Sequence, residues 1–260
     1  MGGRVTEPKI LTLDIETAPL KVYAWGLWDQ NTGVNQIDTE WSILAVCAKW
    51  LGKPPMYADC RGEPLKDLAL LEWTHSLLDE ADIVVTQNGL GFDIKKLNAR
   101  FIAEGFDPYS PVRHIDTKLV AKKHFGFTSN RLEWMGKNVA GQKKSDHKKF
   151  PGFELWAECL KDNLAAWKEM EKYNKQDVIS TEALYLKMRP WIEGHPNLAA
   201  YHGEEIHRCP KCDSSDLQHR GFATTQFGRY QRYQCLDCGG WSRGGRTLLA
   251  ATKKKSLLTN

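Results

Sequence analysis

The sequence predicts an α/β fold, in which helices pack on a mixed sheet, followed by a small second domain. Apolar runs that suit β-strands fill much of the first sixty residues, and short strands alternate with helical spacing further along. This order of elements is typical of a mixed sheet covered by helices. Two Cys-x-x-Cys pairs near the C-terminus stand apart from the pattern and predict a separate module.

Apolar spacing and turn residues define the elements in order. The predicted strands are residues 9–17, a segment within 18–40, 42–51, 56–59, 81–86 and a short strand that ends at 114–117. The predicted helices are residues 65–80, 92–104, 131–139, 153–160 and 163–191. The successive strands near the N-terminus indicate a meander at one side of the sheet.

The composition is that of a soluble globular protein, with 42% hydrophobic and 26% charged residues among 260. This length suffices for one large domain, or for a medium and a small one. No apolar run approaches the ~20 residues that span a bilayer, and the N-terminus lacks the apolar core of a signal peptide. We therefore expect a cytoplasmic protein with no membrane partner.

The positive charge is concentrated at the C-terminus. Residues 207–260 contain ten Lys or Arg and three Asp, a net charge of +7. The whole chain carries +4, which leaves −3 for the rest. A basic appendage on a slightly acidic body predicts a polyanionic partner.

Two acids, Asp14 and Glu16, interrupt the first apolar strand. Side chains two residues apart in a strand point to the same face, so these carboxylates are expected to lie side by side. Like charges are unfavourable there unless a cation lies between them, and hard oxygen ligands suit Mg²⁺ or Mn²⁺. The alternative is a surface strand end with two solvated acids.

Further acids follow in other elements. Asp93 is expected at the start of a helix, where the helix dipole favours a carboxylate, and it is either a ligand or a simple N-terminal acid. Asp116 competes with it as a ligand, or caps a following helix. Tyr173 and Asp177 are four residues apart and share a helix face, as a polar seam or as part of a site.

The combination of these motifs resembles a known family. Asp14-x-Glu16, then Asn88 with Phe92-Asp93, and then Tyr173-x-x-x-Asp177 occur in the order of the DEDD 3′–5′ exonuclease superfamily, which has an RNase H-like fold. Over residues 9–192 the chain looks like its tyrosine class (DEDDy), which includes the proofreading domains of family B DNA polymerases. The histidine class needs His where Lys172 stands. The body also resembles stand-alone exonucleases encoded by bacteriophages.

The resemblance implies a two-metal site for Mg²⁺ or Mn²⁺. Asp14, Glu16 and Asp177 would hold the first ion, and Asp14 would bridge to the second, with Asp93 assisting. Tyr173 would orient the attacking water, because a tyrosine is too weak an acid to serve as a strong base at neutral pH. Two such ions stabilise the attacking and leaving oxygens of an in-line displacement. The expected product is a nucleoside 5′-monophosphate released from a 3′ end.

Substrate contacts are expected next to these motifs. The resemblance to the family implies that the backbone of Thr17 and Ala18 contacts the terminal nucleotide. Asn88 either contacts the substrate or braces its turn. The lysines of the loop at residues 141–151 either track a phosphate backbone or are merely solvated; they are Lys143, Lys144, Lys148 and Lys149.

The C-terminal module, residues 204–247, carries the two Cys-x-x-Cys pairs, separated by 22 residues. In a reducing compartment this spacing predicts one tetrahedral zinc site formed by Cys209, Cys212, Cys235 and Cys238. Thioredoxin-like redox chemistry would need one pair at a βα junction, a context that neither pair has. A basic tail, residues 248–260, follows.

The segment between the two pairs, residues 221–234, alternates like a hairpin. It resembles the zinc ribbons of transposase-associated and other DNA-binding proteins. Arg229, Arg232 and Tyr233 combine cations with an aromatic ring, which suits phosphate contact and base stacking. The alternative is a purely structural zinc with the aromatic residues as a small core.

The sequence therefore predicts an RNase H-like exonuclease domain, residues 1–195, with a C-terminal zinc ribbon. The expected activity is 3′–5′ hydrolysis of single-stranded DNA, with replication or recombination proteins as expected partners and a host cytoplasm if the source is a phage. An exoribonuclease, an endonuclease on the same fold, and a catalytically silent nucleic-acid-binding protein remain as alternatives.

Overall fold

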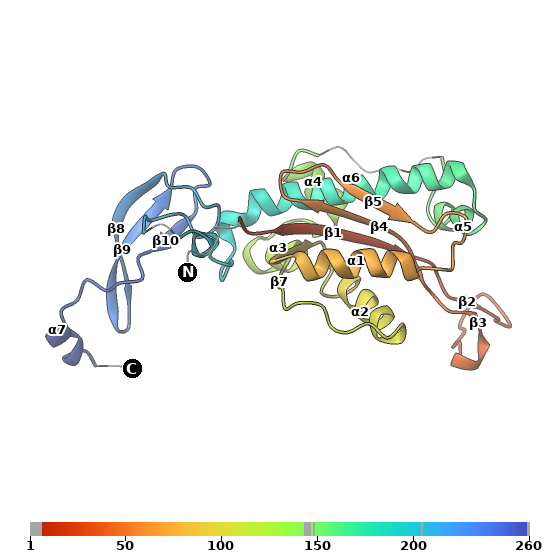
Figure 1. The fold of residues 1–260 in the computed structure, drawn as a ribbon, viewed down its shortest axis with the longest axis horizontal. Helices are drawn as coiled ribbons and strands as arrows, with labels where there is room; N and C mark the ends of the chain where they lie inside the picture. Colours follow the sequence, from red (N-terminus) through yellow and green to blue (C-terminus); the bar gives the residue numbers. More distant parts are fainter. Residues whose placement is uncertain (1–6, 143–146, 148, 204, 259–260) are drawn as a thin grey trace. The chain divides into compact units, whose positions relative to one another are not determined.

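The chain folds into two units, a larger one, Lys9–Tyr185, and a smaller one that contains the chain from Leu186 onward. This computed structural model describes residues 7–142, 147, 149–203 and 205–258. The larger unit is built on a mixed sheet flanked by helices, which confirms the predicted fold class (Figure 1).

Five strands form the sheet of the larger unit, in the order β5-β4-β1-β6-β7. Strands β1 (Ile10–Thr17), β4 (Ile43–Trp50) and β5 (Met56–Asp59) are antiparallel neighbours, which confirms the meander. Strands β6 (Ile83–Thr86) and β7 (Arg113–Asp116) run parallel to β1 on its other side. Parallel neighbours need crossover connections, and α1 and α2 supply them.

The predicted strand within residues 18–40 does not join this sheet. Short strands β2 (Lys21–Val22) and β3 (Ile37–Thr39) pair with each other, with a 3₁₀ turn at Val34–Gln36 between them. The N–H of Ala18 donates to the carbonyl of Ser42 at 2.8 Å. The segment therefore leaves the sheet after β1 and returns next to the same point, just before β4. The sheet position beside β1 is already taken by β4, and the segment becomes a separate hairpin.

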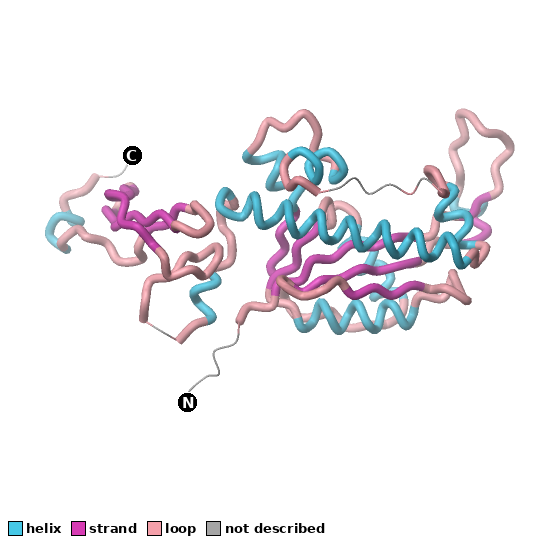
Figure 2. Tube along the Cα trace, turned by 90° about the horizontal axis from the view of Figure 1, so that it is seen from above, coloured by secondary structure: helices cyan, strands magenta, loops and turns pink. Residues whose placement is uncertain are grey.

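Helices cover both faces of the sheet (Figures 1 and 2). Helices α1 (Leu68–Glu80) and α2 (Asp93–Ala103) pack against the odd-numbered apolar residues of β1. Helices α5 (Glu154–Leu160) and α6 (Leu164–Met188) pack on the opposite face. The even-numbered acids of β1 therefore face α5 and α6, as the period of a strand requires.

Two helix predictions differ from the structure in their bounds. Helix α6 ends at Met188 and continues only as a 3₁₀ turn, Arg189–Trp191, because Pro190 cannot donate the next helical hydrogen bond. Helix α1 begins at Leu68 because Asp67 instead bonds the N–H of Ile43 and the guanidinium of Arg100. Helix α3 (Thr117–His124) is the helix that Asp116 was expected, as one alternative, to cap, and α4 (Leu132–Asn138) matches the helix predicted at 131–139.

The smaller unit contains a three-stranded antiparallel sheet in the order β10-β9-β8. Strands β8 (Leu217–Thr225) and β9 (Gly228–Cys235) form the predicted hairpin, and β10 (Trp241–Arg243) pairs with β9. A 3₁₀ turn, Leu198–Tyr201, precedes the sheet, and a short helix α7 (Ala251–Lys255) lies in the basic tail. Among the helices in the described ranges, none is both long and apolar enough to cross a bilayer.

Candidate active site and zinc site

The acids Asp14 and Glu16 lie near the C-terminal end of β1, where they are partly buried under the helices of one face. Their cross-strand partners on β4 are Cys47 and Ala45, which share the same face. The pairing shifts register between Glu16 and Thr17, a β-bulge of the kind that changes the direction of a side chain next to a site.

Both acids receive a hydrogen bond from a helix above them. The side-chain amide of Asn174 on α6 donates to Oδ2 of Asp14 at 2.6 Å. The indole N–H of Trp156 on α5 donates to Oε2 of Glu16 at 3.1 Å. These contacts fix the orientation of the two carboxylates from outside the strand that carries them.

Asp93 reaches the same strand from the other side. Strand β6 pairs only with residues 10–12 of β1, so the backbone beyond Thr12 has no β6 partner. The chain turns after Thr86, and Asp93 begins α2. Its Oδ1 accepts a hydrogen bond from the N–H of Ile15 at 3.0 Å. This buried carboxylate is therefore bound to the residue that lies between Asp14 and Glu16 on β1.

Tyr173 and Asp177 lie on α6 on either side of Asn174, and a hydrogen bond joins the two side chains. The ring of Tyr173 packs edge-on against His147 and Trp156, with centroids 5.2 and 6.1 Å away. His147 also packs against Trp156 at 5.7 Å and bonds the carbonyl of Phe150 through Nδ1 at 2.7 Å. Three rings thus form a wall beside the acids.

The acids influence one another electrostatically. Burial raises the pKa of Asp14 well above its usual value, and the charges of the other three acids raise it further. Burial raises the pKa of Glu16 to about 8, with the charge of Asp177 as the next cause. Burial raises the pKa of Asp93 to about 6, against the lowering effect of its backbone hydrogen bonds. A bound cation would reduce the repulsion between like charges that are buried together.

The donor set fits Mg²⁺ or Mn²⁺, because it consists of carboxylate oxygens from three separate elements. The residues that would hold the ions are Asp14, Glu16, Asp93 and Asp177. In the part of the chain that the structure describes, only the four cysteines form a group of three or more candidate ligands with all ligand atoms within 4.8 Å. The carboxylates are more widely spaced.

Asn88 and Asp116 brace the turn before Asp93. Asn88 has a positive φ of 67°, and its backbone N–H donates to Oδ1 of Asp116 at 2.9 Å. Asp116 is buried, accepts a second bond from Leu90 and caps α3. It therefore has the capping role rather than that of a ligand competing with Asp93. Lys118 donates to Oδ1 of Asn88 at 3.1 Å.

The remaining predicted contacts lie at the end of β1 and in the basic loop. Thr17 is partly buried and Ala18 is fully buried, with its backbone bound to Ser42. Of the loop lysines, Lys149 lies with its ammonium 5.5 Å from the ring of Phe150. The other three lie outside the described residues: Lys143, Lys144 and Lys148.

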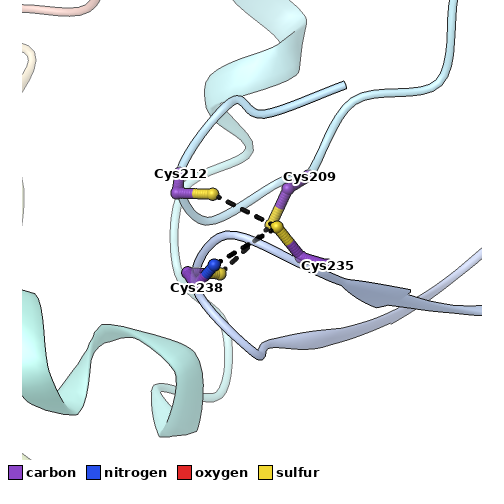
Figure 3. Close-up of side chains that lie close together, drawn as sticks. All are labelled: Cys209, Cys212, Cys235 and Cys238. Carbon is purple, nitrogen blue, oxygen red and sulfur yellow. Dashed lines mark hydrogen bonds between the residues drawn. The ribbon is translucent and has the colours of Figure 1, made fainter. Parts of the chain in front are cut away.

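The four cysteines of the smaller unit form one cluster (Figure 3). The Sγ atoms of Cys209 and Cys238 are 3.7 Å apart, and those of Cys212 and Cys235 are 3.5 Å apart. Zinc–sulfur bonds of about 2.3 Å in a tetrahedron imply sulfurs about 3.8 Å apart, so the cluster fits Zn²⁺.

The two cysteine pairs have the same local geometry. Asp213 follows the first pair and Gly239 the second, both with positive φ, of 69° and 75°. The N–H of Asp213 donates to the carbonyl of Cys209, and that of Gly239 to the carbonyl of Cys235. Each turn therefore brings its two sulfurs to the same side.

The predicted nucleic-acid contacts of the ribbon divide into two kinds. Arg229 and Arg232 are exposed, and their guanidinium groups lie 3.8 and 5.0 Å from the rings of Phe222 and Trp241. Tyr233 is only 8% exposed and packs between His207 and His219. Its ring belongs to the small core of the ribbon and is not placed to stack a base.

Sequence reasoning did not find Asn174, Trp156 or His147. Asn174 had a signal, since it directly follows Tyr173 and is a polar residue on the buried face of a helix. The other two had none, because their contacts with the site depend on how His147 and helix α5 pack against α6 and β1. All three touch residues of the predicted site.

Comparison with known proteins agrees with this architecture. A family model described as the RNase_H superfamily matches residues 11–189. A solved structure of the family B DNA polymerase from the hyperthermophilic archaeon Pyrobaculum calidifontis is similar, with a TM-score of 0.51 and 18% sequence identity. The similarity covers 72% of this chain and 25% of the polymerase, so the chain matches a quarter of that protein. No curated protein matches this chain.

Proposed function

Because the chain belongs to the RNase_H superfamily, we propose that it is a metal-dependent 3′–5′ exonuclease that degrades single-stranded DNA to nucleoside 5′-monophosphates. Membership of the family supports nuclease activity and nucleic-acid binding in general. The polarity and the substrate are the finer parts of the proposal. They rest on the arrangement of the acids and on the motif order, and the similar structure is itself a DNA polymerase.

The observation that carries the proposal is the convergence of four acids from three elements. Asp14 and Glu16 come from β1, Asp93 from α2 and Asp177 from α6. The pKa of Asp14 is raised by burial and by the charges of the other three, so they share one electrostatic environment. Such a repulsive group destabilises the fold unless cations neutralise it, and a two-cation nuclease site uses this arrangement.

When bound, two Mg²⁺ or Mn²⁺ ions supply stabilisation of the attacking and leaving oxygens and lower the pKa of water. Asp14, Glu16 and Asp177 would hold one ion, and Asp93 would help Asp14 to hold the other. Burial raises the pKa of the Tyr173 hydroxyl, with the charge of Asp177 as the next cause. The hydroxyl therefore stays protonated and orients the attacking water by a hydrogen bond.

The zinc ribbon is proposed to hold the nucleic acid. Zn²⁺ on the four cysteines would supply folding energy to a unit with a small core. Arg229 and Arg232 are exposed cations on the hairpin and are proposed to contact phosphates, with their neighbouring rings available to bases. In the cytoplasm, our proposed location, the seven free cysteines remain reduced.

The test is a time course with 5′-labelled single-stranded DNA and RNA of equal sequence, in Mg²⁺ or Mn²⁺. We expect a ladder that shortens from the 3′ end, faster for DNA, and no shortening by Asp14→Ala. Glu72→Ala, which removes an exposed acid on α1, is the matched control and should behave as wild type.

Other outcomes would replace parts of the proposal. Faster shortening of RNA would identify an exoribonuclease, and internal cuts would identify an endonuclease. If both polymers bound but neither was shortened, the protein would be a nucleic-acid-binding protein without activity. Co-purification with replication or recombination proteins would identify the partners that we expect.

A further inference from the structure

The segment between β1 and β4 forms a fixed hairpin, here called the aromatic arm (residues 20–40). Besides the β2–β3 pairing, the N–H of Tyr23 donates to the carbonyl of Gln36 at 2.9 Å. The side chain of Gln36 donates back to the carbonyl of Tyr23 at 2.8 Å, and the Tyr23 hydroxyl donates to Asp38 at 3.0 Å. Hydrogen bonds between its two strands therefore hold the base of the arm in place.

The tip of the arm holds large apolar side chains in water. Trp25 is 98% exposed, Trp28 is 82% exposed and Tyr23 is 68% exposed. Leu27 and Val34 are exposed as well. Soluble proteins rarely gather apolar residues on the surface in this way unless the surface binds something.

The arm originates at the acid site. Residues 18–20 alone connect Thr17, the last residue of β1, to β2. Helix α5 lies between the two features. Its Trp156 binds Glu16, and its Ala157 and Leu160 line a cavity of about 810 Å³ whose wall also includes Leu20 of the arm. One short helix thus contacts both the site and the root of the arm.

The chemistry of the tip favours bases over phosphates. Asp29 is the one charged residue from Tyr23 to Ile37, and Lys21 at the root is paired with Asp38 at 2.8 Å. A surface that binds the backbone of nucleic acid needs cations, whereas flat aromatic rings stack bases of any sequence. Two of the exposed rings are indoles, and the arm that carries them begins three residues after the last residue of β1.

We propose that the aromatic arm stacks unpaired bases of the strand that leads into the acid site, and so selects single strands over duplexes. This inference rests on the proposed function only for the identity of the strand. Trp25 and Trp28 are the stacking residues. Because stacking releases few counterions, the contribution of the arm to affinity is independent of salt, unlike that of the basic ribbon.

The test measures binding in the Asp14→Ala background, so that cleavage plays no part. A 20-nucleotide single strand and the matching duplex are titrated at low and high salt. Trp25→Ala with Trp28→Ala should weaken single-strand binding about 10-fold or more, by the same factor at both salt concentrations, and leave duplex binding unchanged. Replacing both tryptophans by Phe should restore most of the affinity. Leu27→Ala, an aliphatic control on the same arm, should have no effect.

A second measurement locates the contact. Oligonucleotides carrying 5-iodouracil should crosslink under ultraviolet light to the peptide that contains Trp25 or Trp28. Crosslinks and a salt-independent loss would support the arm even if the protein cleaved nothing, which separates this inference from the nuclease proposal. If affinity did not change and crosslinks mapped only elsewhere, the inference would be overturned. Equal melting temperatures of the variants show that folding is unaffected.

Discussion

Asn174 donates a hydrogen bond to Asp14 at 2.6 Å, although the two residues are 160 positions apart in the sequence. Asn174 is completely buried, and its Oδ1 has no hydrogen-bond partner among the described residues. The bond lowers the pKa of Asp14, against the larger effect of burial. The amide therefore favours the charged carboxylate, which is the form that binds a metal ion.

Replacing Asn174 by Ala should weaken metal affinity or activity about 10- to 100-fold, the usual effect of removing a group that orients a metal ligand. The measurement is the Mg²⁺ concentration that gives half-maximal nuclease activity. Gln176→Ala removes a neighbouring amide that bonds Ser180 instead, and should retain wild-type metal dependence. Equal metal dependence of the Asn174 variant and wild type would contradict the orienting role.

Replacing Tyr173 by Phe should reduce turnover about 10²-fold while substrate binding changes little, because the variant loses only the hydroxyl. The ring contacts with His147 and Trp156 remain possible for Phe, so the fold should be retained. Steady-state kinetics and melting temperature together test this. A rise in KM with unchanged kcat would show that the hydroxyl serves binding and not the chemical step.

The stability of the metal-free protein should fall as the pH rises from 5 to 8.5. Burial raises the pKa of Asp93 to about 6 and that of Glu16 to about 8. Between about pH 4 and these pKa values, the folded protein keeps protons that the unfolded chain has already released. The favourable contribution of these protons to the free energy of unfolding is full below about pH 4 and is lost as the pH rises through about 6 and then about 8. Melting in a chelator measures it.

A substitution of Glu16, compared with one of a surface acid, tests whether this pH dependence arises from the site. Glu16→Gln cannot ionise and should show a smaller fall in melting temperature between pH 7 and 8.5, whereas Glu72→Gln, on the surface, should follow wild type. Added Mg²⁺ should reduce the fall, because metal binding needs the deprotonated acids. A melting temperature that rose with pH would show that the acids are not buried together.

One zinc ion per chain should bind to the smaller unit. Cys235→Ser should lose the zinc and unfold β8, β9 and β10, while the larger unit stays folded with its own core. Elemental analysis and circular dichroism measure the two effects. Cys60→Ala, whose thiol donates to the carbonyl of Ile43 in the larger unit, should retain zinc in full.

Lys49 on β4 and Glu182 on α6 form an ion pair of 2.6 Å, with side chains only 11% and 13% exposed. Lys49→Met should destabilise the larger unit by about 3–5 kcal/mol, because it leaves the Glu182 charge buried without its partner. The double variant with Glu182→Leu should recover most of this loss. Denaturant unfolding measures the free energies of unfolding. If the single and the double variant lost equal stability, an unpaired Glu182 charge would not be the cause.

Much of the fold followed from periodicity. The alternation in β1 placed Asp14 and Glu16 on one face, and the structure puts that face under α5 and α6. Local spacing was sufficient because residues i and i+2 share a face in any strand, whatever its pairing. The spacing within each cysteine pair predicted its local turn, and the hairpin between the pairs brings the two turns together.

What sequence patterns did not give depends on contacts between distant segments. A segment within residues 18–40 looks like a strand of the sheet, but β4 already occupies the position next to β1. The capping of α3 by Asp116 was visible as one alternative, whereas its bonds to the turn of Asn88 were not. Trp156 could not be assigned to Glu16, because 140 residues separate them and only the packing of α5 joins them.

The bond between the N–H of Ile15 and Asp93 makes one amide of the central strand a built-in reporter. A metal ion that draws charge from the Asp93 carboxylate will weaken this bond, and the proton resonance of Ile15 will move upfield. Protonation of Asp93 will act in the same direction. The amide of Thr12, which lies opposite Lys49 on β4 and away from the proposed ligands, provides an internal reference. Nuclear magnetic resonance can thus follow occupancy of the site in solution without substrate or label on the nucleic acid.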